Sequence, residues 1–225
     1  GYASPQGPGT DFNTSFGAAI ASQSGLSGYP AGTVNRHQFT MTQGGGTAMS
    51  RGDWGSASSQ LLSQVSPVNV GLQASIDMAT NTLTVDVEVY YTGTQTCASN
   101  CLNIAIVQNG ILGPQSGGAT YNPTAIDPAT GLYTHQHMLR HMLTGQWGEN
   151  IPNITPGTLY TNSFTWTIPN QISGYPQSPT IDPTNIAIVA FVSEGQQEIL
   201  SGTEVSPSLV FANAYDANLI SSSAT

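Results

Sequence analysis

Three of the four histidines lie close together, at positions 135, 137 and 141. On one extended strand these side chains would share a face, because successive side chains alternate between faces. Neutral imidazoles bind zinc or copper, so His135 and His137 are the candidate metal ligands. His141 would lie ~13 Å from His137 along a strand, too far to share an ion. The alternative, that the histidines hydrogen-bond to neighbouring strands, is the interpretation that we favour.

Arg140 is one of only three cationic side chains in the chain, which has twelve acidic residues. On a strand it would lie on the face opposite to the histidines. We expect it to form a structural ion pair with a carboxylate, such as that of Glu149 or Asp127.

The two cysteines, Cys97 and Cys101, are separated by three residues and flanked by two strand-like runs. A disulfide that closes a small loop is the interpretation that we favour, and it implies an oxidising compartment. The alternative is a redox pair, but redox motifs usually have two intervening residues and begin a helix.

Two Asp-Pro turns, at Asp127 and Asp182, place oxygen-bearing side chains close together. Calcium needs about six to eight oxygen ligands, and neither turn is dense in carboxylates, so ordinary turns are the better interpretation. The sequence contains no Gly-x-Ser-x-Gly motif. We therefore expect a protein that is not an enzyme and needs no cofactor, with a divalent metal or calcium as the alternative.

The charge balance restricts the partners. The chain has no lysine, a net charge of -9 and only 7% charged residues. It would repel a phosphate backbone, which excludes nucleic acid, and no run approaches the ~18 apolar residues of a membrane-spanning helix. A surface of hydroxyls and amides suits a secreted or cell-surface protein. We expect its partners to be copies of itself or other cell-surface molecules.

The apolar pattern divides the chain into three parts. Residues 1–66 alternate helical and strand-like patterns, with helices expected from Thr10 to Gly25 and from Asp53 to Ser66, and a strand at 33–39. Residues 67–210 have the period of two that is typical of half-buried strands. The strands are expected at 68–76, 83–91, 102–107, 133–147, 159–168, 186–192 and 197–200. Residues 211–225 would form a C-terminal arm.

The N-terminal part resembles the second half of a thioredoxin fold. The residues that carry the resemblance are Gly25 to Pro30, the expected strand at 33–39 and the helix that begins at Asp53. The resemblance implies that Pro30 is the cis-proline of that fold. The half that would carry a Cys-x-x-Cys motif is missing from this sequence.

The whole chain resembles the 28-kDa outer-membrane-protein-related family of Gram-negative bacteria. The shared motifs are Tyr-Pro-Ala-Gly-Thr-Val-Asn-Arg (29–36), the segment from His135 to Gly148, and Ala-Ile-Val-Ala-Phe-Val (187–192). The resemblance implies export, display at the cell surface, and a mostly β fold. That fold would be an Ig-like antiparallel β-sandwich preceded by a partial thioredoxin-like α/β segment. It supplies no catalytic residues.

These observations favour an exported structural or adhesive module at the outer-membrane surface or outside the cell. Unpaired strand edges and low charge would let such a module assemble with copies of itself through edge pairing. Two alternatives remain open. One is a redox-active thioredoxin-like protein whose Cys-x-x-Cys half lies outside this chain, and the other is a surface protein that binds metal through His135 and His137.

Overall fold

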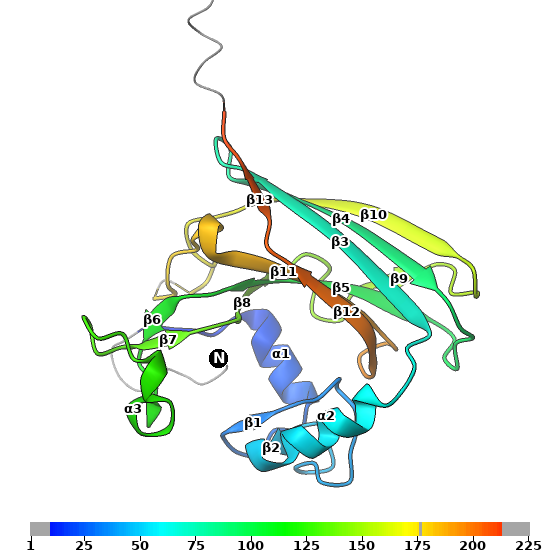
Figure 1. Ribbon diagram of the computed structural model, residues 1–225, viewed down its shortest axis with the longest axis horizontal. Helices are drawn as coiled ribbons and strands as arrows, with labels where there is room; N and C mark the ends of the chain where they lie inside the picture. Colours follow the sequence, from blue (N-terminus) through cyan, green and yellow to red (C-terminus); the bar gives the residue numbers. More distant parts are fainter. Residues whose placement is uncertain (1–9, 176, 213–225) are drawn as a thin grey trace, which may run out of the picture.

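The computed structural model describes residues 10–175 and 177–212, and the fold is mostly β, as expected (Figure 1). Two large sheets contain most of the strand residues, and two small two-stranded sheets accompany them. The predicted arm lies outside the described residues, except for positions 211 and 212. Among the described residues no helix is long and apolar enough to cross a membrane.

The first sheet has four strands, in the order β10 (Leu159–Thr167), β4 (Thr82–Tyr91), β3 (Val68–Asp77) and β13 (Ser208–Val210). The first three are antiparallel, whereas β13 runs parallel to β3. The predicted hairpin of β3 and β4 is confirmed. Its turn contains Asn81 at a φ of 52°, a left-handed conformation that asparagine tolerates better than most residues.

The second sheet has the order β12 (Ile199–Val205), β11 (Ile186–Ser193), β5 (Asn100–Gln108) and β8 (Met138–Met142). A fifth strand, β9 (Glu149–Ile151), also pairs with β5. The predicted hairpin of β11 and β12 is confirmed, and Gly195 takes a positive φ of 58° in its turn.

One hydrophobic core joins the two sheets. It contains alternate residues of β4, including Leu83 and Val85, together with Ile104 of β5 and Ile188 of β11. All four are completely buried. Burying a large aliphatic side chain contributes roughly 1.5–3 kcal/mol, so the alternation read from the sequence is the main determinant of this architecture.

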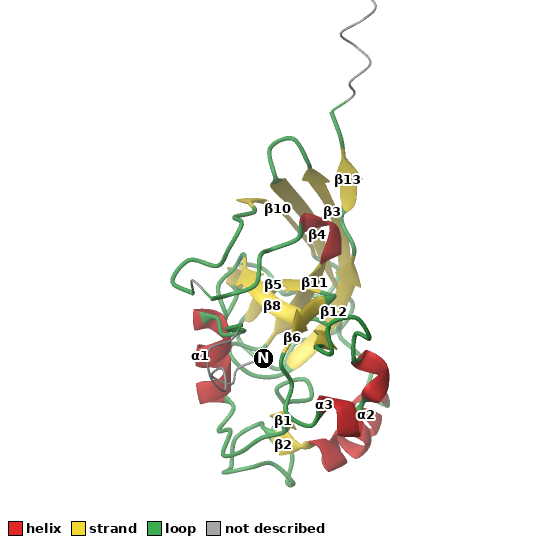
Figure 2. Cartoon of the chain, turned by 90° about the vertical axis from the view of Figure 1, so that its left-hand side faces the viewer, coloured by secondary structure: helices red, strands yellow, loops and turns green. Residues whose placement is uncertain are grey.

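The remaining elements are short, and Figure 2 shows α1, α2, α3, β1 and β2 on the side of the second sheet that faces away from the first. Two helices, two hairpins and several single turns belong to this group: α1 (Ser15–Gln23), β1 (Ala31–Gly32), β2 (Met49–Ser50), η1 (Arg51–Asp53), α2 (Trp54–Leu62), β6 (Ile111–Gly113), α3 (Gly118–Tyr121), η2 (Pro123–Ala125), β7 (Tyr133–His135) and η3 (Pro183–Asn185).

The strand expected at residues 33–39 does not form. Asn35 and Arg36 take positive φ values of 50° and 51°, which end the extended conformation after β1. The Tyr29–Pro30 peptide bond just before β1 is cis.

The apolar face expected for the second helix, α2, is only partly buried. Ala57 is completely buried, but Leu62 is 85% exposed.

The N-terminal segment is attached to the second sheet by polar contacts. The backbone N–H of Ile199 donates to the carbonyl of Asn35 at 2.8 Å, and the Asn35 amide donates back to the carbonyl of Ile199 at 3.1 Å. His37 Nδ1 lies 2.6 Å from Glu198 Oε1. These contacts fix the segment against the β11–β12 hairpin.

Candidate functional site

The histidine-rich segment forms two strands rather than the single strand that was predicted. β7 ends at His135 and pairs with β6, whereas β8 begins at Met138 and pairs with β5. His137 lies between them with a φ of 50°, and its N–H donates to Asn109 Oδ1 at 2.8 Å. Because of this break at His137, the prediction that the three histidines share one face of one strand is wrong.

His135 is buried against aromatic rings. Its ring centroid lies 4.6 Å from that of Phe12 and 5.0 Å from that of Tyr133. Burial lowers its pKa, so the folded protein favours the neutral imidazole. Among the described residues, its Nε2 has no hydrogen-bond partner. His135 therefore packs as a core ring.

His137 points to the surface. It is exposed, and its Nε2 lies 3.2 Å from Glu204 Oε1 on β12. One predicted metal ligand is thus enclosed by Phe12 and Tyr133, and the other is paired with a carboxylate across the second sheet. Within the described ranges, no group of three histidine, cysteine, aspartate or glutamate side chains is placed to hold a metal.

His141 joins the two sheets at their edge. Its ring stacks on Trp166 of β10, with centroids 4.6 Å apart and an interplanar angle of 4°, and Phe16 of α1 meets it edge-on at 5.2 Å. Burial lowers the pKa of His141 as well. Strand parity in the sequence gave no indication of this stack, because Trp166 and Phe16 are distant in the chain.

Arg140 has no carboxylate partner within residues 10–175 and 177–212, which corrects the predicted ion pair with Glu149 or Asp127. Its side chain is 1% exposed, and its Nη2 donates to Ser178 Oγ at 3.0 Å and to the carbonyl of Pro179. In the described part of the chain the ion pairs are those of His37 and His137. Burial lowers the pKa of Arg140 to about 10. The loop before η3 therefore replaces Glu149 or Asp127 as the acceptor.

Arg36, in the motif at 29–36, contacts one residue of each of the other two motifs, at 135–148 and 187–192. Its guanidinium carbon lies 5.7 Å from the ring centroid of Trp147 and 5.3 Å from that of Phe191, and Nη2 donates to the carbonyl of Gln146 at 3.5 Å. Cation–π contacts of this kind stabilise by about 0.5–2 kcal/mol. The cluster anchors the N-terminal segment and leaves Arg36 only 5% exposed.

The two cysteines are not bonded to each other in the structure, and the disulfide stays a prediction. Cys101 lies within β5, opposite Ser193 and Asn150, whereas Cys97 precedes the strand and its Sγ accepts a hydrogen bond from Asn100 at 3.1 Å. Burial, and then the nearby carboxylate of Glu194, raises the pKa of Cys97. Cys97 is therefore less reactive than an ordinary cysteine.

The two Asp-Pro turns use their carboxylates internally. Asp127 Oδ1 accepts hydrogen bonds from the N–H groups of Ala129 and Thr130, at 3.0 and 2.7 Å. Asp182 Oδ1 accepts in the same way from Thr184 N at 2.9 Å. The hydroxyls of Thr130 and Thr184 donate to the same two oxygens at 2.8 and 2.7 Å, and these side-chain bonds, with the backbone ones, lower the pKa of both aspartates. Both are the turns that the sequence favoured.

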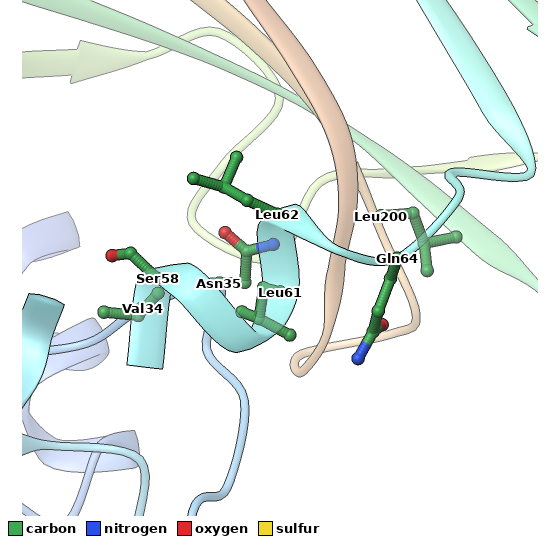
Figure 3. A pocket seen from close by; sticks show the side chains of 7 residues that line it. All are labelled: Val34, Asn35, Ser58, Leu61, Leu62, Gln64 and Leu200. Atoms are coloured by element: carbon green, nitrogen blue, oxygen red, sulfur yellow. The ribbon is translucent and has the colours of Figure 1, made fainter. Parts of the chain in front are cut away.

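A hollow of about 370 Å³ lies between α2 and the beginning of β12 (Figure 3). It is lined by aliphatic, hydroxyl and amide side chains: Val34, Asn35, Ser58, Leu61, Leu62, Gln64 and Leu200. None of these side chains titrates between pH 4 and 10. The lining thus offers apolar contact and hydrogen bonds, and the Ser58 hydroxyl has no acidic or basic side chain beside it among the lining residues.

The outer edge of β10 is an unpaired edge of the first sheet in the described structure. β10 pairs with β4 over all nine residues, and among the described residues no strand pairs with its other side. The carbonyl of Thr158 and the N–H of Ile168 point to β4. The backbone N–H and C=O groups of the even-numbered residues of β10 therefore point to β4, and those of the odd-numbered residues point to the open edge. Of the outward N–H groups, that of Ser163 bonds to Asn162 Oδ1 at 2.9 Å.

β10 also lacks the features that protect other edges. Charged side chains, proline and short length discourage edge pairing. β12 carries Glu204, β8 carries Arg140, and β13 has three residues, whereas β10 has no charge and no proline over its nine residues. The candidate functional surface of this protein is therefore an edge of backbone donors and acceptors, which sequence reasoning did not locate.

Comparisons with known proteins agree with this architecture. The model of the outer membrane protein Omp28 family matches residues 18–208. The structure of HBP35 of Porphyromonas gingivalis is similar with a TM-score of 0.62 and 16% identity, over 85% of this chain and 57% of that protein. This chain therefore spans little more than half the length of HBP35, and the likeness concerns the fold.

A domain of the outer membrane lipoprotein Omp28 from the same organism matches with a TM-score of 0.40 and 18% identity, over 65% of this chain and 92% of that domain. Among curated proteins no sequence matches. The family match covers most of the chain, including the motifs that meet at Arg36. By this family match the chain belongs to the Omp28 outer membrane protein family, which places it at the outer-membrane surface.

Proposed function

We propose that this protein is a non-catalytic structural module that associates with copies of itself or with other surface molecules through strand edges. We also propose the two-part fold that the sequence predicts. In it, an Ig-like β-sandwich forms the scaffold, and the N-terminal segment is a thioredoxin-like remnant fixed to it. The single core shared by the two sheets supports the first part. The two helices α1 and α2 of the N-terminal segment support the second.

The observation that carries the associative function is the uncharged outer edge of β10. Unpaired N–H and C=O groups in a row can accept a further strand through main-chain hydrogen bonds, with side-chain contacts adding specificity. β10 itself carries no charged side chain, so this edge has none of the local charge that discourages strand pairing.

The test is to place a charge on this edge. Thr161→Lys and Thr165→Lys change exposed, outward-pointing residues of β10. We expect the wild type to associate in sedimentation velocity as its concentration rises, and both variants to associate at least about tenfold more weakly. Gln60→Lys adds the same charge on exposed α2 and should associate as the wild type does.

A wild-type protein that remains monomeric at all concentrations, alone and with outer-membrane extracts, would contradict the proposal. Equal weakening by all three lysine variants would show that association does not depend on the β10 edge and would also contradict the proposal.

A further inference from the structure

We propose that the strand which occupies the β10 edge is the segment 213–225 of a second copy of this chain. This inference rests on the proposed function and specifies its partner. It begins with the inner face of β10, where Tyr160, Phe164 and Trp166 pack against the core but are only partly buried. A strand added beside β10 would cover these aromatic rings as well as the backbone groups.

The segment 213–225 has the pattern of such a strand. Tyr215, Ala217 and Leu219 alternate with Asp216 and Asn218. Alternation of apolar and polar residues is the signature of a strand that covers one buried face. Paired beside β10, the apolar side would extend the row of Tyr160, Phe164 and Trp166, and the polar side would face water.

The place where the chain leaves the sheet argues for a second copy. β13 lies at the edge of the first sheet opposite to β10, and it ends at Val210, which is opposite Asp77 at the end of β3. To reach its own β10 edge, the following segment must cross four strand spacings, ~19 Å, which takes about six residues. Residues 211–216 would be used in crossing, and half of the alternating stretch would be lost from pairing.

The segment does not have to cross its own sheet when it pairs with the β10 edge of a neighbouring molecule. β10 is antiparallel to β4, and β4 to β3, so β10 and β13 run in the same direction along the sheet. A strand donated from one edge to the opposite edge of the next molecule is a heterologous contact. Such contacts form rings when the rotation closes and open filaments when it does not.

The test uses two variants that remove opposite sides of the contact. Ala217→Pro places a proline in the middle of the alternating stretch, where it removes a backbone donor. Thr165→Lys charges the acceptor edge. Each variant alone should associate at least about tenfold more weakly than the wild type in sedimentation velocity. A mixture of the two should form one-to-one heterodimers and nothing larger, because one intact edge and one intact segment remain.

Ser222→Pro lies outside the alternating stretch and should associate as the wild type does. The melting temperature of each variant reports whether the fold is retained. If Ala217→Pro associates as strongly as the wild type while Thr165→Lys does not, the edge pairs with something other than this segment, and the inference is overturned although the proposed function stands. If the mixture yields no heterodimer, the head-to-tail contact is likewise refuted.

Discussion

His141 illustrates how a side chain noticed for its chemistry is used for packing. Its ring lies between Trp166 of one sheet and Phe16 of α1, and burial lowers its pKa. His135, enclosed by Phe12 and Tyr133, shows the same direction of shift. Both contacts hold the imidazole away from water, so both favour its neutral form.

The first prediction concerns pH. A histidine whose pKa is lowered in the folded state binds fewer protons there than in the unfolded chain. Stability is therefore unaffected above the unfolded value of about 6.5 and falls as the pH drops below it. We expect urea titrations to show a falling free energy of unfolding from pH 7 to pH 5.

His141→Phe keeps a stacking ring and should reduce this dependence on pH. His137→Gln, which changes an exposed histidine, serves as the control and should retain most of it. A His141→Phe protein with the full acid sensitivity of the wild type would show that His141 is protonated in the folded state.

The second prediction concerns Arg140. Its charge is buried without a carboxylate, and its Nε and Nη1 have no partner among the described residues. Replacing such a group by an apolar one of similar volume is often neutral or stabilising. We expect Arg140→Met to unfold within about 1 kcal/mol of the wild type or at higher denaturant, and Arg140→Ala to lose about 2–5 kcal/mol through the cavity that it leaves. A loss above about 3 kcal/mol in Arg140→Met would reveal an ionic partner.

At the scale of elements, the connection from β8 to β9 depends on a glycine. Gly148 has a φ of 77°, and a Cβ there would lie 2.6 Å from the carbonyl oxygen of Leu102. Gly145 in the same connection has a φ of 68°, but a Cβ there would meet no atom within 4 Å. The third prediction is that Gly145→Ala costs about 1–2 kcal/mol, the cost of the left-handed backbone alone, and that Gly148→Ala costs clearly more. Denaturant unfolding of the two variants measures the difference, and equal losses would contradict the clash.

The elements also show what could be predicted from the sequence. β3, β4 and β10 follow from apolar alternation, because burying one face of a strand requires it, and β11 follows from a continuous apolar run, because both of its faces are covered. The segment from Tyr133 to Trp147 was predicted wrongly, since its division at His137 depends on pairing with β6 and β5. The acceptors of Arg140 were missed for the same reason. Ser178 lies in a loop 38 positions away, and nothing local to Arg140 indicates it.

For the whole molecule, the fourth prediction concerns the division of the chain. The sequence predicts separate units at 1–66 and 67–210, yet Arg36 packs between Trp147 and Phe191, and Asn35 bonds to Ile199. We expect calorimetry to give one cooperative transition, because these contacts couple the two units. Arg36→Met should lower that transition by several degrees, and Arg51→Met, which changes an exposed arginine, should lower it less. Two separate transitions in the wild type would contradict the coupling.

The burial of arginine has a consequence for survival among proteases. Trypsin cleaves after lysine or arginine, and this chain has no lysine and three arginines. Arg36 and Arg140 are 5% and 1% exposed, so in the folded protein only the bond after Arg51 is accessible to the enzyme. A molecule displayed outside the cell thus offers a trypsin-like protease a single point of attack, in the turn that precedes α2.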